Sequence, residues 1–129
     1  MEVEGWSGSD CVGDSSVLIC RSKGRAGGAP FEGVILLCYD AQNGTYTAAG
    51  AHTAFPGRLL LDEGTYDEAS QTISWAEHDV LVLGSSEKVL AKGEETFEDG
   101  DTILQTVSIK RPGSETYVKW AETTFRRRK

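Results

Sequence analysis

The apolar positions of the chain fall into short extended runs that turn-forming residues separate. The clearest pair runs from Val34 to Cys38 and from Thr45 to Gly50, and Asn43 and Gly44 lie in the connection. An apolar run of strand length, an Asn-Gly turn and a second β-prone run together predict a β-hairpin. The run from Val34 to Cys38 has no polar alternation, so we expect a strand covered on both faces, the most buried of the sheet.

Further extended segments are expected on both sides of this hairpin. They cover residues 5–10, 15–23, 58–67, 72–79, 87–97, 102–110 and 115–125, and Gly24–Pro30 is expected to be a flexible connection. No segment keeps a helical period, and the short connections require antiparallel neighbours. Such a meander closes into a barrel or splits into a sandwich. The sequence therefore predicts one all-β domain over residues 1–129, an antiparallel up-and-down β-barrel of about eight or nine strands.

One contact between neighbouring strands is predicted inside this sheet. Gly64 weakens its strand, and Trp75 on the next strand lies at the right separation in the sequence to cover it. Aromatic cover of a strand glycine is a known packing device. We therefore expect the indole of Trp75 to lie against Gly64.

The same segments resemble a known family. The run from Phe31 to Asp40, followed by Gly44-Thr45-Tyr46, resembles the G-Y-D-x-x-x-x-x-Y signature of a bacterial family of domains of unknown function with a lipocalin-like, calycin-type barrel. Glu63–Asp67 resembles the E-G-x-Y-D strand end of that family, and Thr124–Arg127 resembles its closing aromatic-basic pair. The resemblance covers residues 15–128 and implies a barrel with an internal cavity. It implies no catalytic residue.

The chain departs from the family pattern in two places. Cys38 stands where a glycine is usual, and the N-terminal portion is shorter, so the resemblance predicts a barrel that is shortened at the N-terminus and open at one end. Gly5-Trp6-Ser7-Gly8 also resembles the opening of haem-binding barrels of the nitrobindin type, but it is one residue short. No histidine lies near the C-terminal strand to ligate iron, so we expect no haem and no other cofactor.

Charge and hydropathy restrict the class of partner. The chain has 13 basic and 20 acidic residues, and four of the basic residues form its C-terminal end. An acidic surface repels phosphate backbones, so no nucleic-acid partner is expected. No apolar run matches a signal peptide or spans a bilayer, so we expect a soluble cytoplasmic protein with no membrane partner. The three cysteines, Cys11, Cys20 and Cys38, are odd in number and form no C-x-x-C, so we expect buried free thiols.

Catalytic and metal sites have little support in the sequence. His52 and His78 lack metal-ligand spacing, so we interpret each as a locally bonded side chain and expect no metal. No motif for nucleophilic catalysis occurs. Glu63, Glu77 and Asp79 lie on adjacent strands and would form an acid–base pair if buried, but a solvated sheet face is the favoured interpretation. We therefore expect binding rather than catalysis.

Aromatic residues either line a ligand cavity or fill the core of such a barrel. The candidates are Trp6, Tyr39, Tyr46, Trp75 and Trp120. Small residues from Ala48 to Ala51 leave room in the interior unless larger side chains opposite reach across it. We expect Trp75 to form the cavity wall, Tyr46 and His52 to be polar anchors near the mouth, and Trp120 to contribute as well.

Two functions of different classes remain open. The leading hypothesis is non-catalytic binding of a small, partly apolar or aromatic molecule inside the barrel. The alternative is a structural or interaction module that forms a homodimer, or docks a partner protein, through its outer sheet face. A cavity around Trp75, Tyr46 and His52 would favour the first hypothesis, and a solid core with an exposed apolar sheet face would favour the second.

Overall fold

The computed structural model describes residues 3–12, 17–53, 59–82 and 85–126, with the backbone alone for residues 3–12 and Ala26. Within these ranges the chain forms strands and turns and no helix. The strands are β1 (Val3–Val12), β2 (Val17–Ala26), β3 (Ala29–Asp40), β4 (Thr45–His52), β5 (Leu60–Asp67), β6 (Thr72–Trp75), β7 (His78–Leu81), β8 (Lys88–Asp99), β9 (Thr102–Lys110) and β10 (Val118–Arg126). All paired strands are antiparallel. The predicted all-β antiparallel fold is confirmed.

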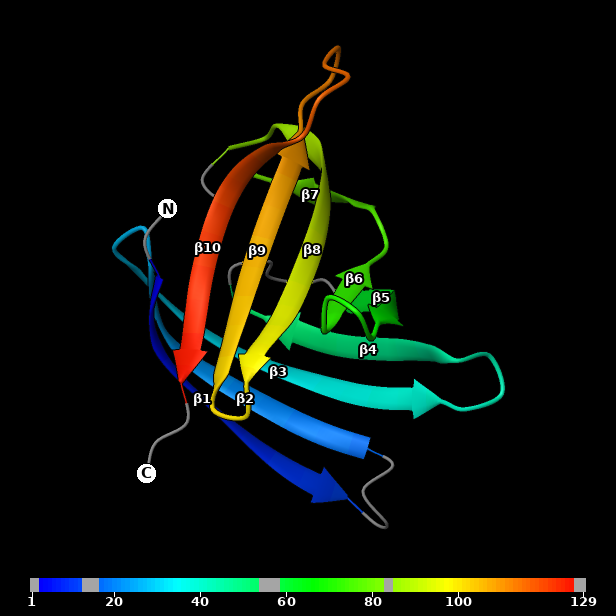
Figure 1. Ribbon diagram of the computed structural model, residues 1–129. Helices are drawn as coiled ribbons and strands as arrows, with labels where there is room; N and C mark the ends of the chain where they lie inside the picture. Colours follow the sequence, from blue (N-terminus) through cyan, green and yellow to red (C-terminus); the bar gives the residue numbers. More distant parts are fainter. Residues whose placement is uncertain (1–2, 13–16, 54–58, 83–84, 127–129) are drawn as a thin grey trace.

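The strands form one sheet whose order follows the chain. The order is β1-β2-β3-β4-β5-β6-β8-β9-β10, and β7 pairs with β8. The segment predicted as one strand over 72–79 is two short strands, because the chain leaves the ladder at Ala76 and Glu77. The sheet curls so that β8–β10 lie in front of β1–β4 (Figure 1). The end strands β1 and β10 contact each other, although no ladder joins them in the described residues, so the fold is a curled half-barrel.

The connection between β2 and β3 is tighter than predicted. β2 continues to Ala26 and β3 begins at Ala29, so Gly27 and Gly28 alone make the turn. Their φ angles are 55° and 82°, and a two-residue hairpin turn with positive φ at both positions is easily formed by glycine. The prediction of a flexible Gly24–Pro30 connection is wrong, since these two glycines permit a tight turn rather than loosen the chain.

The predicted hairpin between β3 and β4 is confirmed, and Asp40 organises its turn. The Gly44 amide donates to the Asp40 carbonyl at 2.8 Å, and the Gln42 amide donates to Asp40 Oδ1 at 2.9 Å. Asn43 Nδ2 donates to Asp40 Oδ2 at 2.6 Å. These hydrogen bonds lower the pKa of Asp40 below its ordinary value because they favour the ionised carboxylate. The bond from the Asn43 side chain has the largest effect.

Alternation along the strands gives the sheet a concave and a convex face. The buried apolar side chains of the described residues all lie on the concave face. They are Ile73, Val89, Ala91, Ile109 and Ala121. Cys20 and Cys38 form no disulfide with each other and are only half-buried, so the prediction that these side chains are buried is wrong. The Cys11 side chain lies outside the described residues.

β3 is not the most buried strand, so that prediction is wrong. Val34 and Leu36 point to the convex face and are 42% and 43% exposed, while Ile35 points to the concave face and is 39% exposed. A continuous apolar run indicates two covered faces only where a second layer exists. Here one curled sheet leaves the convex side of β3 uncovered in the described part of the chain.

Candidate functional site

Trp75 lies at the centre of a row of concave-face residues that runs from β4 to β8. The ladders pair Gly64 with Tyr46 on one side and with Trp75 on the other. A Cβ atom added to Gly64 would lie 2.8 Å from Trp75 Cε3, so the indole covers the backbone of this glycine. A Cβ at Gly93 would lie 3.5 Å from Trp75 Cδ1. The predicted cover of Gly64 is confirmed, and the indole lies between two glycines.

A carboxyl group lies beside this indole. Glu95 Oε1 accepts a hydrogen bond from Gln105 Nε2 at 3.0 Å, and the Trp75 side chain donates a second bond to the same carboxyl group. Burial raises the pKa of Glu95 above its ordinary value, and the two hydrogen bonds offset this only in part. No ion pair links Glu95 to a cation of the described residues. Glu95 is therefore an acid held by neutral donors.

A second acid of the concave face pairs with a histidine. Asp62 Oδ1 lies 3.2 Å from His78 Nδ1, and His78 Nδ1 lies 3.4 Å from the Ala76 carbonyl oxygen. Burial raises the pKa of Asp62, and the neighbouring His78 opposes that shift less strongly. The interpretation of His78 as a locally bonded side chain agrees with these contacts.

Three tyrosines form an aromatic cluster on the concave face of β3–β5. The rings of Tyr39 and Tyr46 have centroids 5.0 Å apart, and Tyr66 meets Tyr46 edge-on at 6.4 Å. Tyr39 and Tyr66 are 55% and 43% exposed, although they share the face that carries the core. The cluster therefore offers accessible aromatic surface one strand away from Trp75.

His52 lies apart from Tyr46 and Trp75. It pairs with Gly33 six positions beyond Tyr46 on β4, which is about 20 Å along an extended strand. Its ring stacks on Phe31 with centroids 4.9 Å apart, and burial lowers the pKa of His52. The sheet thus brings Tyr46 and Trp75 to either side of one glycine but holds His52 at the other end of β4.

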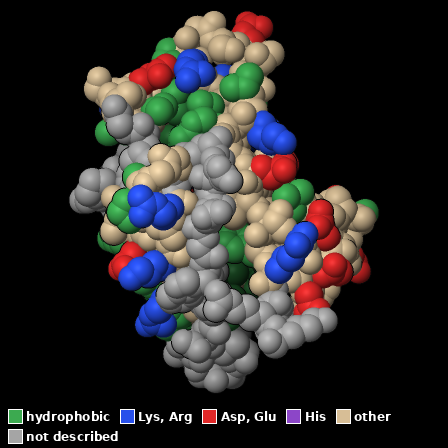
Figure 2. Space-filling model, turned by 90° about the vertical axis from the view of Figure 1, so that its left-hand side faces the viewer, with side chains coloured by type: hydrophobic (Ala, Val, Ile, Leu, Met, Phe, Trp, Pro, Cys, Tyr) green, Lys and Arg blue, Asp and Glu red, His purple; other side chains and the backbone are tan. Residues whose placement is uncertain are grey.

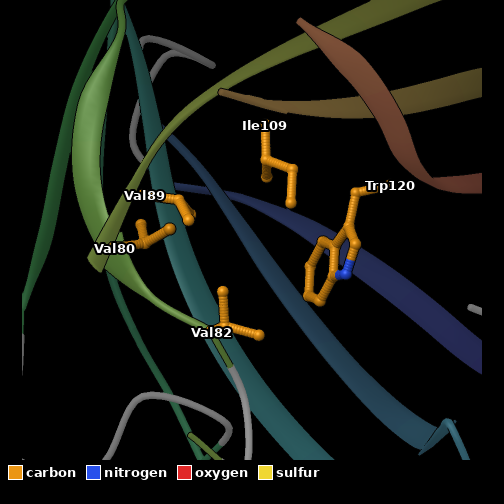
Figure 3. A pocket seen from close by; sticks show the side chains of 5 residues that line it. All are labelled: Val80, Val82, Val89, Ile109 and Trp120. Carbon is orange, nitrogen blue, oxygen red and sulfur yellow. The ribbon is translucent and has the colours of Figure 1, made fainter. Parts of the chain in front are cut away.

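Trp120 lies at a bulge of β10, where the register shifts between Lys119 and Ala121. A bulge inserts an extra residue into a strand and changes the direction of its side chain. Here the indole faces apolar side chains of β7, β8 and β9 and of the residue after β7. The side chains around it are Val80, Val82, Val89 and Ile109, and together they line a small apolar pocket (Figure 3). The pocket volume of about 10 Å³ is near the minimum for one water molecule, so it does not accommodate an organic ligand.

Sequence reasoning considered Asp62, together with the histidines, as a possible metal ligand, but it did not single out Glu95. Glu63, Glu77 and Asp79 are exposed, as expected of a solvated face. Glu95 follows Val89, Ala91 and Gly93 at two-residue spacing, so alternation along the strand alone would have placed it on the apolar face. Trp6, a candidate for the cavity wall, has its side chain outside the described residues. No group of three or more potential metal ligands occurs in the described part of the chain.

Charge separates the two faces of the sheet. Every Lys and Arg of the described strands occupies a convex position in the ladders, namely Arg21, Lys23, Arg25, Lys88, Lys92, Lys110, Lys119 and Arg126. Figure 2 shows basic, acidic and hydrophobic side chains side by side on one side of the molecule. The acids at concave positions of these strands are Asp62 and Glu95. The described concave face therefore carries acidic but no permanently basic side chains.

Comparison with known proteins gives one result. The family described as "Protein of unknown function (DUF1579)" matches residues 2–127. No curated protein and no solved structure gives a significant match. Within the described residues, no helix has the length and apolar character of a membrane span.

Proposed function

The chain belongs to this family of proteins of unknown function, DUF1579, and we propose that it binds a small, partly apolar molecule on the concave face around Trp75, without catalysis. We also propose, as expected from the sequence, that the protein is related to lipocalins, is bacterial and is located in the cytoplasm. The observation that carries it is the incomplete filling of the concave face.

Large side chains on that face remain accessible. Ile35, Tyr39 and Tyr66 are 39%, 55% and 43% exposed, whereas the interior of a filled barrel would bury them. The chain exposes 8704 Å², against about 6,700 Å² expected for a compact protein of 14.0 kDa. Accessible apolar surface of this kind marks binding sites more often than it occurs by chance.

The chemistry of the face fits binding. Trp75 and Tyr46 supply flat aromatic surface, and such rings contribute strongly to contact with apolar ligands. The carboxyl group of Glu95 is fixed by its donors, and polar groups held in this way orient a ligand. We therefore expect an apolar body against the aromatic rings and a polar group toward the acid.

The test uses the neutral apolar dye Nile red, whose emission rises in an apolar site. We expect saturable binding that Trp75→Ala weakens and that Leu36→Ser leaves unchanged, because Leu36 lies on the convex face. Circular dichroism and thermal melting establish that each variant is folded. Loss of binding in Leu36→Ser alone would move the site to the convex face, and absence of saturable binding would refute the proposal.

A second candidate function is self-association through the convex face. Val34, Leu36 and Leu61 share that face on β3 and β5 and are 42%, 43% and 75% exposed. A second copy of the chain is the occupant we propose, because a two-fold homodimer uses one patch twice. Sedimentation of the wild type and of Leu36→Ser tests it: a wild-type dimer that becomes monomeric in the variant supports this candidate, and a monomeric wild type excludes it.

A further inference from the structure

On the described part of the concave face, all charges have one sign apart from the two histidines. Asp62 and Glu95 occupy concave positions, and the Lys and Arg residues of the described strands lie on the other face. A surface of low dielectric constant strengthens the field of the acids that it holds. A ligand that reaches the concave face therefore meets an electronegative surface.

The two acids differ in how their charge is compensated. Asp62 has the imidazole of His78 at 3.2 Å, which neutralises it whenever that ring is protonated. Among the described residues, Glu95 has the neutral donors of Gln105 and Trp75 and no cation. A carboxylate accepts about four hydrogen bonds, so Glu95 keeps acceptor capacity beyond these two. A half-buried carboxylate without a cation is costly, and a bound cation would relieve that cost.

We propose that the ligand of the concave face carries a positively charged nitrogen on an apolar or aromatic body, and that Glu95 is the counter-ion of that nitrogen. This inference rests on the proposed function and specifies its ligand class. Because the Trp75 side chain donates to Glu95, a ligand that contacts this indole lies beside the carboxylate. Because Gly64 and Gly93 have no side chains, the indole lies directly against the backbone of β5 and beside that of β8.

The same geometry disfavours anionic ligands such as fatty acids. An anion would approach Glu95 and Asp62 without a lysine or arginine on this face of the described strands to receive it. Like charges brought together on a poorly solvated surface repel each other. The order expected for ligands of one shape is therefore cation first, neutral second and anion last.

The test compares three probes of nearly equal shape by isothermal titration calorimetry. They are 3-phenylpropylamine, 3-phenylpropanol and 3-phenylpropionate, which are cationic, neutral and anionic at neutral pH. We expect the amine to bind about tenfold more tightly than the alcohol, as a charge-assisted hydrogen bond provides, and the carboxylate to bind most weakly. Glu95→Gln should remove the preference for the amine and keep the affinity for the alcohol.

The control is Glu63→Gln, which removes the same charge from an exposed convex position of β5 and should keep the preference. Equal binding of amine and alcohol to the wild type, with both weakened in Trp75→Ala, would overturn the inference and leave the proposed function standing. Persistence of the preference in folded Glu95→Gln would also overturn it. If none of the three probes binds but Nile red does, the inference fails and the proposed function stands; if Nile red does not bind either, both fail. The wild-type ranking needs no variant, so the ligand class stays testable if Glu95→Gln does not fold.

Discussion

The indole of Trp75 lies against the backbone of Gly64 on the neighbouring strand, at a place where no side chain larger than hydrogen fits. A Cβ atom there would lie 2.8 Å from Trp75 Cε3 and 2.9 Å from Ile73 Cγ2. This contact fixes the position of the ring that we place at the centre of the ligand site. The glycine is thus part of the site, although it offers no functional group.

The first prediction follows from this contact. Gly64→Ala should destabilise the fold by about 1–3 kcal/mol, because the added methyl group displaces Trp75 or Ile73. Gly93→Ala is the matched control, since its Cβ would meet Trp75 Cδ1 at an ordinary 3.5 Å. Urea unfolding measures both variants. Equal free energies of unfolding for Gly64→Ala and the wild type would show that the ring does not lie where we describe it.

The contact between Trp75 and Gly64 could be predicted from the sequence because it depends on local signals. The turn over residues 68–71 determines which residues of β5 and β6 pair with each other. Turn-forming residues can be recognised in the sequence. The same holds for the hairpin at Asp40, whose bonds reach at most four residues along the chain. Local sequence patterns are therefore enough to predict most of the strands and the pairing of residues next to short turns.

Burial could not be predicted in the same way. The apolar run around Leu36 suggests two covered faces, but cover depends on whether a second layer exists, and no local pattern reports that. His52 and Tyr46 lie close in sequence on one strand, yet an extended chain separates them by about 20 Å. The concave position of Glu95 could have been predicted, because alternation along β8 places this residue on the same face as Val89 and Ala91. Acids are rarely buried, so composition alone argues against such a position.

The second prediction concerns the two-residue turn between β2 and β3. Gly28→Ala should destabilise by about 1–2 kcal/mol, because φ is positive there and L-residues disfavour that region. An added Cβ would meet nothing within 4 Å, so the loss is one of backbone conformation and not of packing. Gly27→Asn should be tolerated, since Asn-Gly is the preferred pair for this turn. Thermal melting measures both variants. An equal drop in melting temperature for Gly28→Ala and Gly27→Asn would contradict the assigned turn.

The third prediction concerns Cys20 and Cys38. Cys20 pairs with Ile35 and Cys38 with Val17, so the two residues are three ladder positions apart, about 10 Å along the strands, and face opposite sides of the sheet. A disulfide needs Cα atoms within about 7 Å. Mass spectrometry of denatured, unreduced protein should therefore find no disulfide between Cys20 and Cys38. A peptide pair linked through Cys20 and Cys38 would require a different register of β2 on β3.

The fourth prediction is a pH dependence that belongs to Glu95. Burial raises the pKa of this carboxyl group in the folded protein above its value in the unfolded chain, so the folded state holds the proton more tightly. The resulting cost to stability is absent below the unfolded pKa, grows as pH rises through the folded pKa and is complete above it. Glu95→Gln carries no such proton. Its melting temperature relative to the wild type should therefore rise as pH increases from about 4, near the ordinary glutamate pKa, to 8.

Taking the difference between variant and wild type isolates Glu95 from Asp62, whose pKa is also raised and which titrates in both proteins. Glu63→Gln serves as the control for the loss of one negative charge, because this acid lies exposed on the convex face of the same sheet. If Glu95 is the counter-ion of an amine, 3-phenylpropylamine at pH 8 should raise the melting temperature of the wild type more than that of Glu95→Gln, because the bound cation offsets the cost of the ionised acid. A pH-independent difference between wild type and Glu95→Gln would mean that this carboxyl group is solvated in the folded protein, and it would remove the physical reason for a cationic ligand.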